Sequence, residues 1–208
     1  MSFTRLIPAR YEGSTARERL AYLERCVANC RKCPRLAETR THTVFGEGSF
    51  EIGGIFIVGE APGSDEDACG KPFVGRAGQI LEKGLDRLCL QRKDVYIANC
   101  LKCRPDPPLG RGNRPPTRGE MQDCVPFLLA QIEIVDPFVI LALGNSALEA
   151  LGIDAQISKV RGTVIRSEHQ HCAVVPTWHP AYVLRNPNAE TYEQFYGDLE
   201  MACELLTA

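Results

Sequence analysis

The sequence predicts an α/β fold in which helices cover both faces of a parallel sheet. Four short apolar runs are typical of buried strands, and they span residues 54–58, 95–98, 138–143 and 173–176. Segments with apolar residues at three- and four-residue steps lie between these runs. Strands that alternate with helices indicate βαβ units with right-handed crossovers, and therefore a parallel sheet.

Five helices are expected from apolar periodicity and capping residues. In the first, Leu20 and Leu23 recur at helical spacing. In the third, Thr117 and Glu120 have the spacing of a capping box, and Pro126 predicts a kink or break further along. The five expected helices span residues 15–29, 78–90, 117–135, 145–151 and 188–206.

The chain has 208 residues, which suits one α/β domain. We expect residues 1–14 to form a loosely held N-terminal arm and residues 15–208 to form the single domain. The segment 105–116 is rich in Pro, Gly and Arg, which indicates a loop. Its arginines, Arg111 and Arg114, are candidates for phosphate contact.

Composition narrows the classes of function. The formal net charge of −2 does not indicate a nucleic-acid-binding protein, although a local basic face matters more than the sum. No apolar run approaches the roughly 20 residues that span a bilayer, and the first residues lack the apolar core of a secretory signal. We therefore expect a cytoplasmic protein without a membrane partner, and a monomer by default.

Ten cysteines are many for a chain with these features. Disulfide frameworks suit small secreted domains, so ligation of a metal or cluster by some of the thiols is the better explanation. Cys30 and Cys33 form a CxxC pair after the first helix, and Cys103 and Cys124 are more distant candidates. Four thiolates would suit structural zinc or a [4Fe–4S] cluster; a redox pair or ordinary thiols are the alternatives. The remaining cysteines are not expected to be ligands: Cys26, Cys69, Cys89, Cys100, Cys172 and Cys203.

A residue able to do chemistry follows each of the four apolar runs: Glu60, Asn99, Asn145 and His179. Ligands of open α/β sheets bind outside the carboxyl ends of the strands. If the strands are parallel, these four residues converge on one pocket. Taken alone, each of them has a structural alternative, such as a turn cap.

The chemistry of this set suits a flat heterocycle that leaves as an anion. The turn at residues 59–63 holds two glycines, which would leave backbone N–H groups free to bind an oxyanion. Phe73, flanked by Gly and Pro on a loop, is able to stack on a planar ring. The amide of Asn99 offers an acceptor and two donors to a ring edge, and His179 can donate to a developing negative oxygen.

Several motifs occur together in a specific order and spacing. They are GEAPG (59–63) followed by Glu66-Asp67, GKPFVGRAG (70–78), VYIAN (95–99) with KCRP (102–105), NRPPT (113–117), ISKVRG (157–162) and HPAYVLRNP (179–187). This set resembles the iron–sulfur uracil-DNA glycosylases, family 4 of the uracil-DNA glycosylase superfamily. The resemblance covers roughly residues 30–187.

The resemblance implies a three-layer αβα sandwich around a four-stranded parallel sheet. It also implies a [4Fe–4S] cluster with a structural role rather than a redox cycle. The cluster ligands would be Cys30, Cys33, Cys103 and Cys124. Structural zinc is the alternative for the same four thiols.

The resemblance further implies a pocket for uracil. Phe73 would stack on the flipped base, Asn99 would bind its O4 and N3–H edge, and His179 would donate to O2 as the main catalytic residue. Glu60 is the second catalytic candidate, as a group that positions water or orients the turn. The turn residues expected to bind uracil, chiefly through backbone N–H groups on the O2 side, are Gly59, Glu60, Ala61 and Gly63.

DNA contacts are expected at other places along the chain. The segment 180–185 would be a loop that inserts into the duplex, with Tyr182, Val183 or Leu184 as the wedge and Arg185 beside it. The other expected DNA-binding residues are Arg111, Arg114 and Arg161.

The implied function is excision of uracil from DNA by hydrolysis of the N-glycosidic bond of a flipped-out deoxyuridine. Such a monofunctional repair glycosylase leaves an abasic site for downstream abasic-site repair enzymes, and its partner is uracil-containing DNA. Two alternatives stay open. One is a glycosylase of broader scope that also accepts hypoxanthine or xanthine, and the other is a non-catalytic iron–sulfur protein that binds DNA or transfers electrons.

Overall fold

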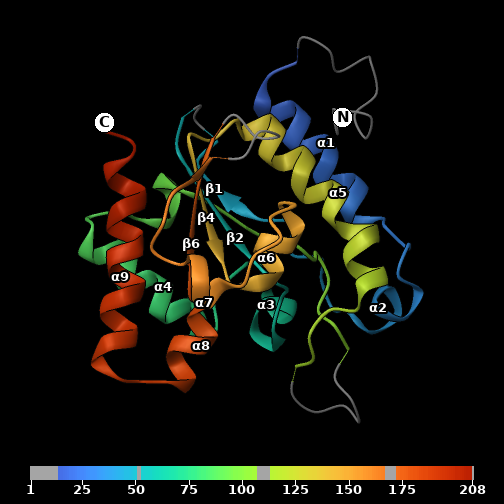
Figure 1. The fold of residues 1–208 in the computed structure, drawn as a ribbon. Helices are drawn as coiled ribbons and strands as arrows, with labels where there is room; N and C mark the ends of the chain where they lie inside the picture. The colour runs from blue at the N-terminus through green and yellow to red at the C-terminus, as the bar shows by residue number, and fades with distance from the viewer. Residues whose placement is uncertain (1–13, 51–52, 107–112, 167–171, 208) are drawn as a thin grey trace.

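In a computed structural model, the chain forms a six-stranded sheet with helices on both faces (Figure 1). The structure describes residues 14–50, 53–106, 113–166 and 172–207. The strands lie in the order β1-β3-β2-β4-β6-β5. The four inner strands are parallel to one another: β3 (Tyr96–Asn99), β2 (Ile55–Gly59), β4 (Val139–Leu143) and β6 (Ala173–Thr177).

Two short antiparallel strands lie at the edges of the sheet. β1 (Glu47–Gly48) pairs with β3, and β5 (Ile165–Arg166) pairs with β6. The four strands expected from the sequence and their parallel pairing are confirmed, but the expected count of four strands for the sheet is wrong. Strands of two residues are too short to carry an apolar period, so only their backbone pairing identifies them.

Each inner strand is buried along its whole length. Successive side chains of a strand point to opposite faces of the sheet. In β2, Phe56 and Val58 pack into one helix layer, whereas Ile55 and Ile57 pack into the other. Both faces are therefore covered, which explains why the strands are near-continuous apolar runs rather than alternating ones.

The two helix layers are unequal in size. The first layer consists of α1 (Ala16–Ala28), α2 (Pro34–Thr39), α5 (Arg118–Val135), α6 (Asn145–Ala150) and α7 (Ile157–Val160). The second consists of α4 (Arg76–Arg87), α8 (Pro180–Arg185) and α9 (Ala189–Glu204). Figure 1 shows α1 lying along α5 on one side of the sheet, and α9 with α4 on the other. The short α3 (Ser64–Cys69) follows β2, and a 3-10 turn (Arg92–Asp94) precedes β3.

All five expected helices are present, with ends shifted by at most three residues. The capping boxes of Thr15 with Glu18 and of Thr117 with Glu120 are both formed. Helix α5 continues through Pro126, so the expectation of a break there is wrong. The segment expected to be an insertion loop, residues 180–185, is instead the helix α8. Pro180 stands at its first position, where a missing N–H is harmless.

No helix in the described part of the chain is long and apolar enough to cross a membrane. The expected N-terminal arm falls on residues 1–13, which lie outside the described residues, and on Ser14.

Candidate active site

A cleft of about 350 Å³ opens at the carboxyl edge of the sheet. The parallel register sets Gly59 of β2 beside Asn99 of β3, and Leu143 of β4 beside Thr177 of β6. The chain leaves β2 for α4 on one face and leaves β3 for α5 on the other. A crevice at such a reversal is the usual ligand site of an open α/β sheet.

Three expected pocket residues line this cleft together: Phe73, Asn99 and His179. They come from the loop after β2, from the end of β3 and from the residues after β6. The ring centroids of Phe73 and His179 lie 5.8 Å apart. Ala61 and Gly63, from the turn after β2, line the same cleft. The parallel sheet therefore brings these side chains together, as their places at strand ends predict.

Asn99 carries an unusual polar atom. Its Oδ1 is buried and has no hydrogen-bond partner among the residues that the structure describes. A buried acceptor without a partner is costly, so this oxygen is placed to receive a donor from a ligand. A Cβ on Gly59 would stand 2.3 Å from Asn99 Oδ1 and 2.4 Å from Cζ of Phe73. Glycine at this position therefore leaves room for both side chains.

His179 caps α8 and has a defined tautomer. Its Nδ1 accepts a hydrogen bond from the backbone N–H of Ala181 at 3.1 Å. A neutral ring that accepts at Nδ1 carries its proton on Nε2. Burial, and then the positive charge of Arg185, lower the pKa of His179 to about 4. The ring is therefore a neutral Nε2–H donor at physiological pH.

A buried network supports the chain just after β3. Lys102 is 1% exposed; its ammonium group donates to the backbone carbonyl of Asn99 at 2.8 Å and to Oε1 of Gln131 in α5. Gln131 in turn donates to the carbonyl of Phe45 and to the hydroxyl oxygen of Tyr96. Burial lowers the pKa of Lys102 to about 8. The network ties the backbone of Asn99 to α5.

Glu60 is not among the described residues that line the cleft. Its carboxylate accepts a hydrogen bond from Ser146 Oγ at 2.6 Å, and its carbonyl accepts from the N–H of Leu101. Asn145, which also follows a strand, accepts from the N–H of Ile157 at 2.8 Å. Glu60 and Asn145 thus connect the loops at this edge of the sheet, and neither belongs to the cleft wall.

Two arginines expected at DNA are bound within the protein instead. Arg114 pairs with Asp106 at 2.8 Å, and Arg161 pairs with Asp198 of α9. Both guanidinium groups are half-buried and bind carboxylates with little exposure, so they join loops to the core rather than stand free for phosphate. Arg111 lies outside the described residues.

The residues of α8 separate into three kinds. Val183 is fully buried in the core beside α4 and α9, so its expected role as a wedge is wrong. Tyr182 is exposed and stacks on Trp178, with ring centroids 4.6 Å apart. Leu184 and Arg185 line the cleft. The helical turn decides this division, because it directs neighbouring residues to different sides.

Sequence reasoning assigned no individual role to eight other residues of the cleft wall: Ser64, Asp65, Glu66, Gly75, Arg76, Ala77, Asn113 and Ala181. Glu66, Arg76 and Asn113 lie inside the motifs quoted above, which is the signal that would have drawn attention to them. Arg76 is exposed at the first position of α4 and adds positive charge to the rim.

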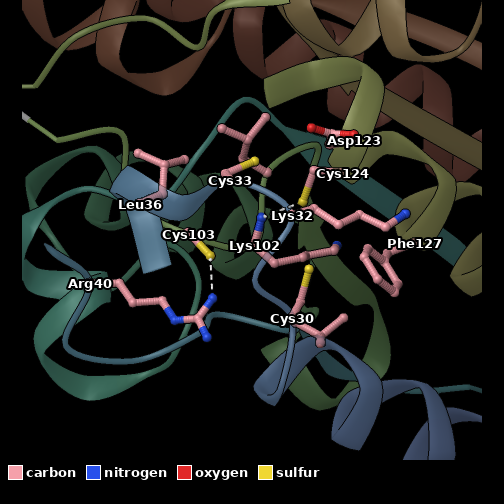
Figure 2. Close-up of a pocket in the computed structure, with 12 residues that line it drawn as sticks. Cys30, Lys32, Cys33, Leu36, Arg40, Lys102, Cys103, Asp123, Cys124 and Phe127 are labelled. Atoms are coloured by element: carbon pink, nitrogen blue, oxygen red, sulfur yellow. Dashed lines mark hydrogen bonds between the residues drawn. The ribbon is translucent and has the colours of Figure 1, made fainter. Parts of the chain in front are cut away.

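The four candidate ligand cysteines line a second, small pocket (Figure 2). Cys30 and Cys33 precede α2, Cys103 follows β3, and Cys124 lies in α5. Figure 2 shows the four side chains coming from these separate segments toward a common region. The structure therefore brings together the thiols that the sequence set apart as candidates.

Two N–H groups point at sulfur atoms in this pocket. The backbone N–H of Lys102 donates to Sγ of Cys124 at 3.2 Å, and the guanidinium of Arg40 donates to Sγ of Cys103 at 3.1 Å. Hydrogen bonds to sulfur are among the contacts that stabilise cluster thiolates. Burial raises the pKa of Cys124 to about 12 and that of Cys33 to about 11, so a metal would displace protons on binding.

The chemistry of the four thiols suits a soft metal centre. Thiolates are ligands both of structural zinc and of iron–sulfur clusters. Within the described residues, no three Cys, His, Asp or Glu side chains are arranged to hold a single metal ion.

Together, the fold and the cleft define an α/β protein with a ligand-sized cleft, lined by an aromatic ring and polar side chains, at the carboxyl edge of its sheet. A family model described as the uracil DNA glycosylase superfamily matches residues 45–200. The chain belongs to this superfamily, within its type-4 branch.

Three of the most similar curated relatives are type-4 uracil-DNA glycosylases. The relative from Thermotoga maritima is 44% identical over 190 residues, which cover 90% of this chain and 95% of the relative. The relative from Pyrobaculum aerophilum is 41% identical over 189 residues, 88% of this chain and 92% of the relative. The relative from Archaeoglobus fulgidus is 40% identical over 194 residues, which cover 89% of this chain and 94% of the relative.

The lowered pKa of His179 predicts how stability changes in acid. Between pH 6.5 and about 4, the unfolded chain binds a proton at this position and the native protein does not. The stability that the neutral ring contributes is therefore present above pH 6.5 and is lost as the pH falls toward 4. When the pH is lowered from 6.5 to 4, we expect the free energy of unfolding to fall less in His179→Gln than in the wild type. Urea denaturation at both pH values measures this difference.

The matched control is His42→Gln, a substitution of an exposed histidine. It is expected to leave the difference between the two ends of the window within about 0.5 kcal/mol of the wild-type value. An equal pH dependence in wild type and His179→Gln would contradict the lowered pKa of His179 in the native protein.

Proposed function

We propose that this chain removes uracil from DNA by hydrolysing the N-glycosidic bond of a flipped-out deoxyuridine, and that the cleft is the active site. The observation that carries the proposal is the unpartnered, buried Oδ1 of Asn99 at the end of β3. An acceptor fixed there selects a ring edge that carries an N–H, and the Asn99 amide nitrogen offers a donor to the adjacent carbonyl. The N3–H and O4 of uracil are such a pair, whereas cytosine has an acceptor at N3 and a donor at C4.

Phe73 and the turn after β2 complete the recognition of the base. The Phe73 ring supplies a flat apolar surface in the cleft, and stacking on an aromatic ring contributes about 1–3 kcal/mol per base in other proteins. Ala61, in the same turn, lines the cleft, and its backbone N–H is the proposed partner of the O2 side. The base is reached only after the nucleotide leaves the duplex stack, because the glycosidic carbon is inaccessible inside it.

His179 is the proposed catalytic residue. When the glycosidic bond breaks, its electron pair goes to uracil, which leaves as an anion with charge on O2. A neutral ring with its proton on Nε2 donates a hydrogen bond to that oxygen and does not need a positive charge to do so. Water then adds to the sugar C1′, loses a proton to solvent, and leaves an abasic site. We propose that Glu60 orients the turn through Ser146 rather than acts on the base.

The rim of the cleft is the proposed DNA surface. Leu184 is the proposed wedge, since it lines the cleft while Val183 is buried. Arg76 and Arg185 are both exposed at the rim, so their charges can meet the phosphates on either side of the flipped nucleotide.

The thiol pocket is the proposed site of a [4Fe–4S] cluster held by Cys30, Cys33, Cys103 and Cys124. When bound, such a cluster would cross-link α2, α5 and the chain after β3, so its role is structural. Because all ten cysteines are free of disulfides, a reducing compartment suits the chain, and we propose a cytoplasmic monomer. Enzymes that process abasic sites would take over its product.

Uracil release from a uracil-containing oligonucleotide tests the proposed function. The wild-type protein is expected to yield free uracil and an abasic site, with no strand cleavage until alkali is added. His179→Ala is expected to lower the single-turnover rate by about 100-fold or more, because an oxyanion donor is lost. His42→Ala, the control, is expected to keep the wild-type rate. Absence of uracil release by the cluster-containing wild type would overturn the proposal.

Asn99→Ala tests the reading of the base. The substitution removes the side-chain acceptor that prefers N3–H of uracil. The ratio of kcat/KM for uracil over cytosine is therefore expected to fall by about 10-fold or more. The measurement compares matched oligonucleotides that carry uracil or cytosine opposite guanine. Unchanged discrimination would remove Asn99 from recognition.

Cys103→Ser tests the cluster. The wild-type protein is expected to be brown, with iron and acid-labile sulfide in equal amounts, and the variant is expected to lose the visible absorbance and part of its thermal stability. Cys89→Ser, at an exposed cysteine outside the pocket, is the matched control and is expected to retain both. A colourless wild type with stoichiometric zinc would show that the alternative metal is correct.

A further inference from the structure

Phe73 has a backbone conformation that is unusual for its residue type. Its φ is 52°, in the left-handed region that residues with a Cβ rarely adopt. Helix α4 packs directly on this backbone, since a Cβ on Gly78 would stand 1.9 Å from the Phe73 carbonyl oxygen. The ring lies above Gly59 and is 6% exposed. The loop therefore needs contacts that hold this conformation.

One charged side chain binds the carbonyl groups of the loop. The guanidinium of Arg92 donates to the backbone oxygens of Pro72 and Phe73, the latter at 3.2 Å. The same group is held by the carboxylates of Glu47 at 2.8 Å and Glu82 at 2.5 Å. A planar guanidinium with five N–H donors can serve these four acceptors at once, whereas a lysine ammonium has only three donors.

A second charged side chain binds the amide groups that follow. Oε1 of Glu66 accepts from the N–H of Val74 at 3.0 Å and from the N–H of Gly75 at 2.9 Å. Its Oε2 accepts from the N–H of Gly63 at 3.0 Å. One carboxylate therefore joins the turn after β2 to the loop that carries Phe73.

We propose that Arg92 and Glu66 are positioning residues that hold Phe73 in its left-handed conformation from both sides, and that they thereby set the affinity of the cleft for the base. The inference rests on the proposed function, and it deepens that function by naming what positions the stacking ring. Arg92 binds the two carbonyls up to and including Phe73, and Glu66 binds the two amides just after it. If one of these contacts is lost, Phe73 is free to relax to a negative φ. Its ring then no longer lies parallel to the base.

The test is a double-mutant cycle on the inhibition constant of free uracil, the product. Arg92→Lys keeps the positive charge but loses the planar guanidinium with its five N–H donors. It is expected to weaken uracil inhibition about 10-fold in the wild-type background. Phe73→Leu keeps apolar bulk but removes the aromatic ring. In that background, Arg92→Lys is expected to change the inhibition constant less than about twofold, because its effect passes through the ring.

Arg87→Lys is the matched control: it makes the same change near the end of α4, where Arg87 lies over the ring of Tyr196. It is expected to leave the inhibition constant unchanged. Thermal unfolding shows whether each variant folds. If Arg92→Lys does not fold, Glu66→Gln replaces it in the cycle. The glutamine amide presents an N–H group where one carboxylate oxygen of Glu66 accepted a hydrogen bond. Its effect on the inhibition constant is likewise expected to be small in the Phe73→Leu background.

Two outcomes overturn the positioning inference alone. One is a folded Arg92→Lys or Glu66→Gln variant that binds uracil as tightly as the wild type. The other is an equal loss of uracil affinity in the wild-type and Phe73→Leu backgrounds. In both, the wild type still releases uracil, so the proposed function stands. A wild type that neither releases nor binds uracil overturns the proposed function and this inference with it.

Discussion

The buried ammonium group of Lys102 joins the two halves of the site. A charge taken out of water needs hydrogen-bond partners, and Lys102 finds them in the carbonyl of Asn99 and in Gln131 of α5. Its own backbone N–H binds the sulfur of Cys124, and the next residue is Cys103. One short segment therefore carries the amide proposed to read the base at one end and a candidate cluster ligand at the other. Removing one partner of a buried charge typically costs about 3–5 kcal/mol, so the segment has little freedom to move.

The cleft is built largely from loops, and charged side chains hold those loops by binding backbone groups directly. Buried Lys102 binds Asn99, while half-buried Arg92 and Glu66 bind the residues around Phe73. Such charge-assisted hydrogen bonds are stronger than neutral ones. This arrangement suits an enzyme that must accept a base extruded from DNA, because a recognition surface that is already in place need not be ordered on binding.

Much of the frame could be predicted, because it follows from local pattern. The four inner strands are continuous apolar runs, and the capping boxes at Thr15 and Thr117 are short-range signals. The convergence of Asn99, at the end of β3, and His179, just after β6, follows from the parallel topology. Local pattern failed where the partner of a side chain is set by the fold. Arg114 and Arg161 look like free charges in the sequence, but the fold supplies Asp106 and Asp198 for them. Val183 looks like a wedge until the helical turn of α8 directs it into the core.

The sequence by itself determined the class of fold, the convergence of Phe73, Asn99 and His179, and the choice of four cysteines out of ten, since these depend on periodicity, spacing and residue chemistry. Only the tertiary structure decided how each group is set for its task. It placed the proton of His179 on Nε2, left Oδ1 of Asn99 without a partner, and surrounded the left-handed Phe73 with Arg92 and Glu66. The physical reason is that protonation, orphaned acceptors and backbone strain depend on burial and on contacts between residues distant in the chain.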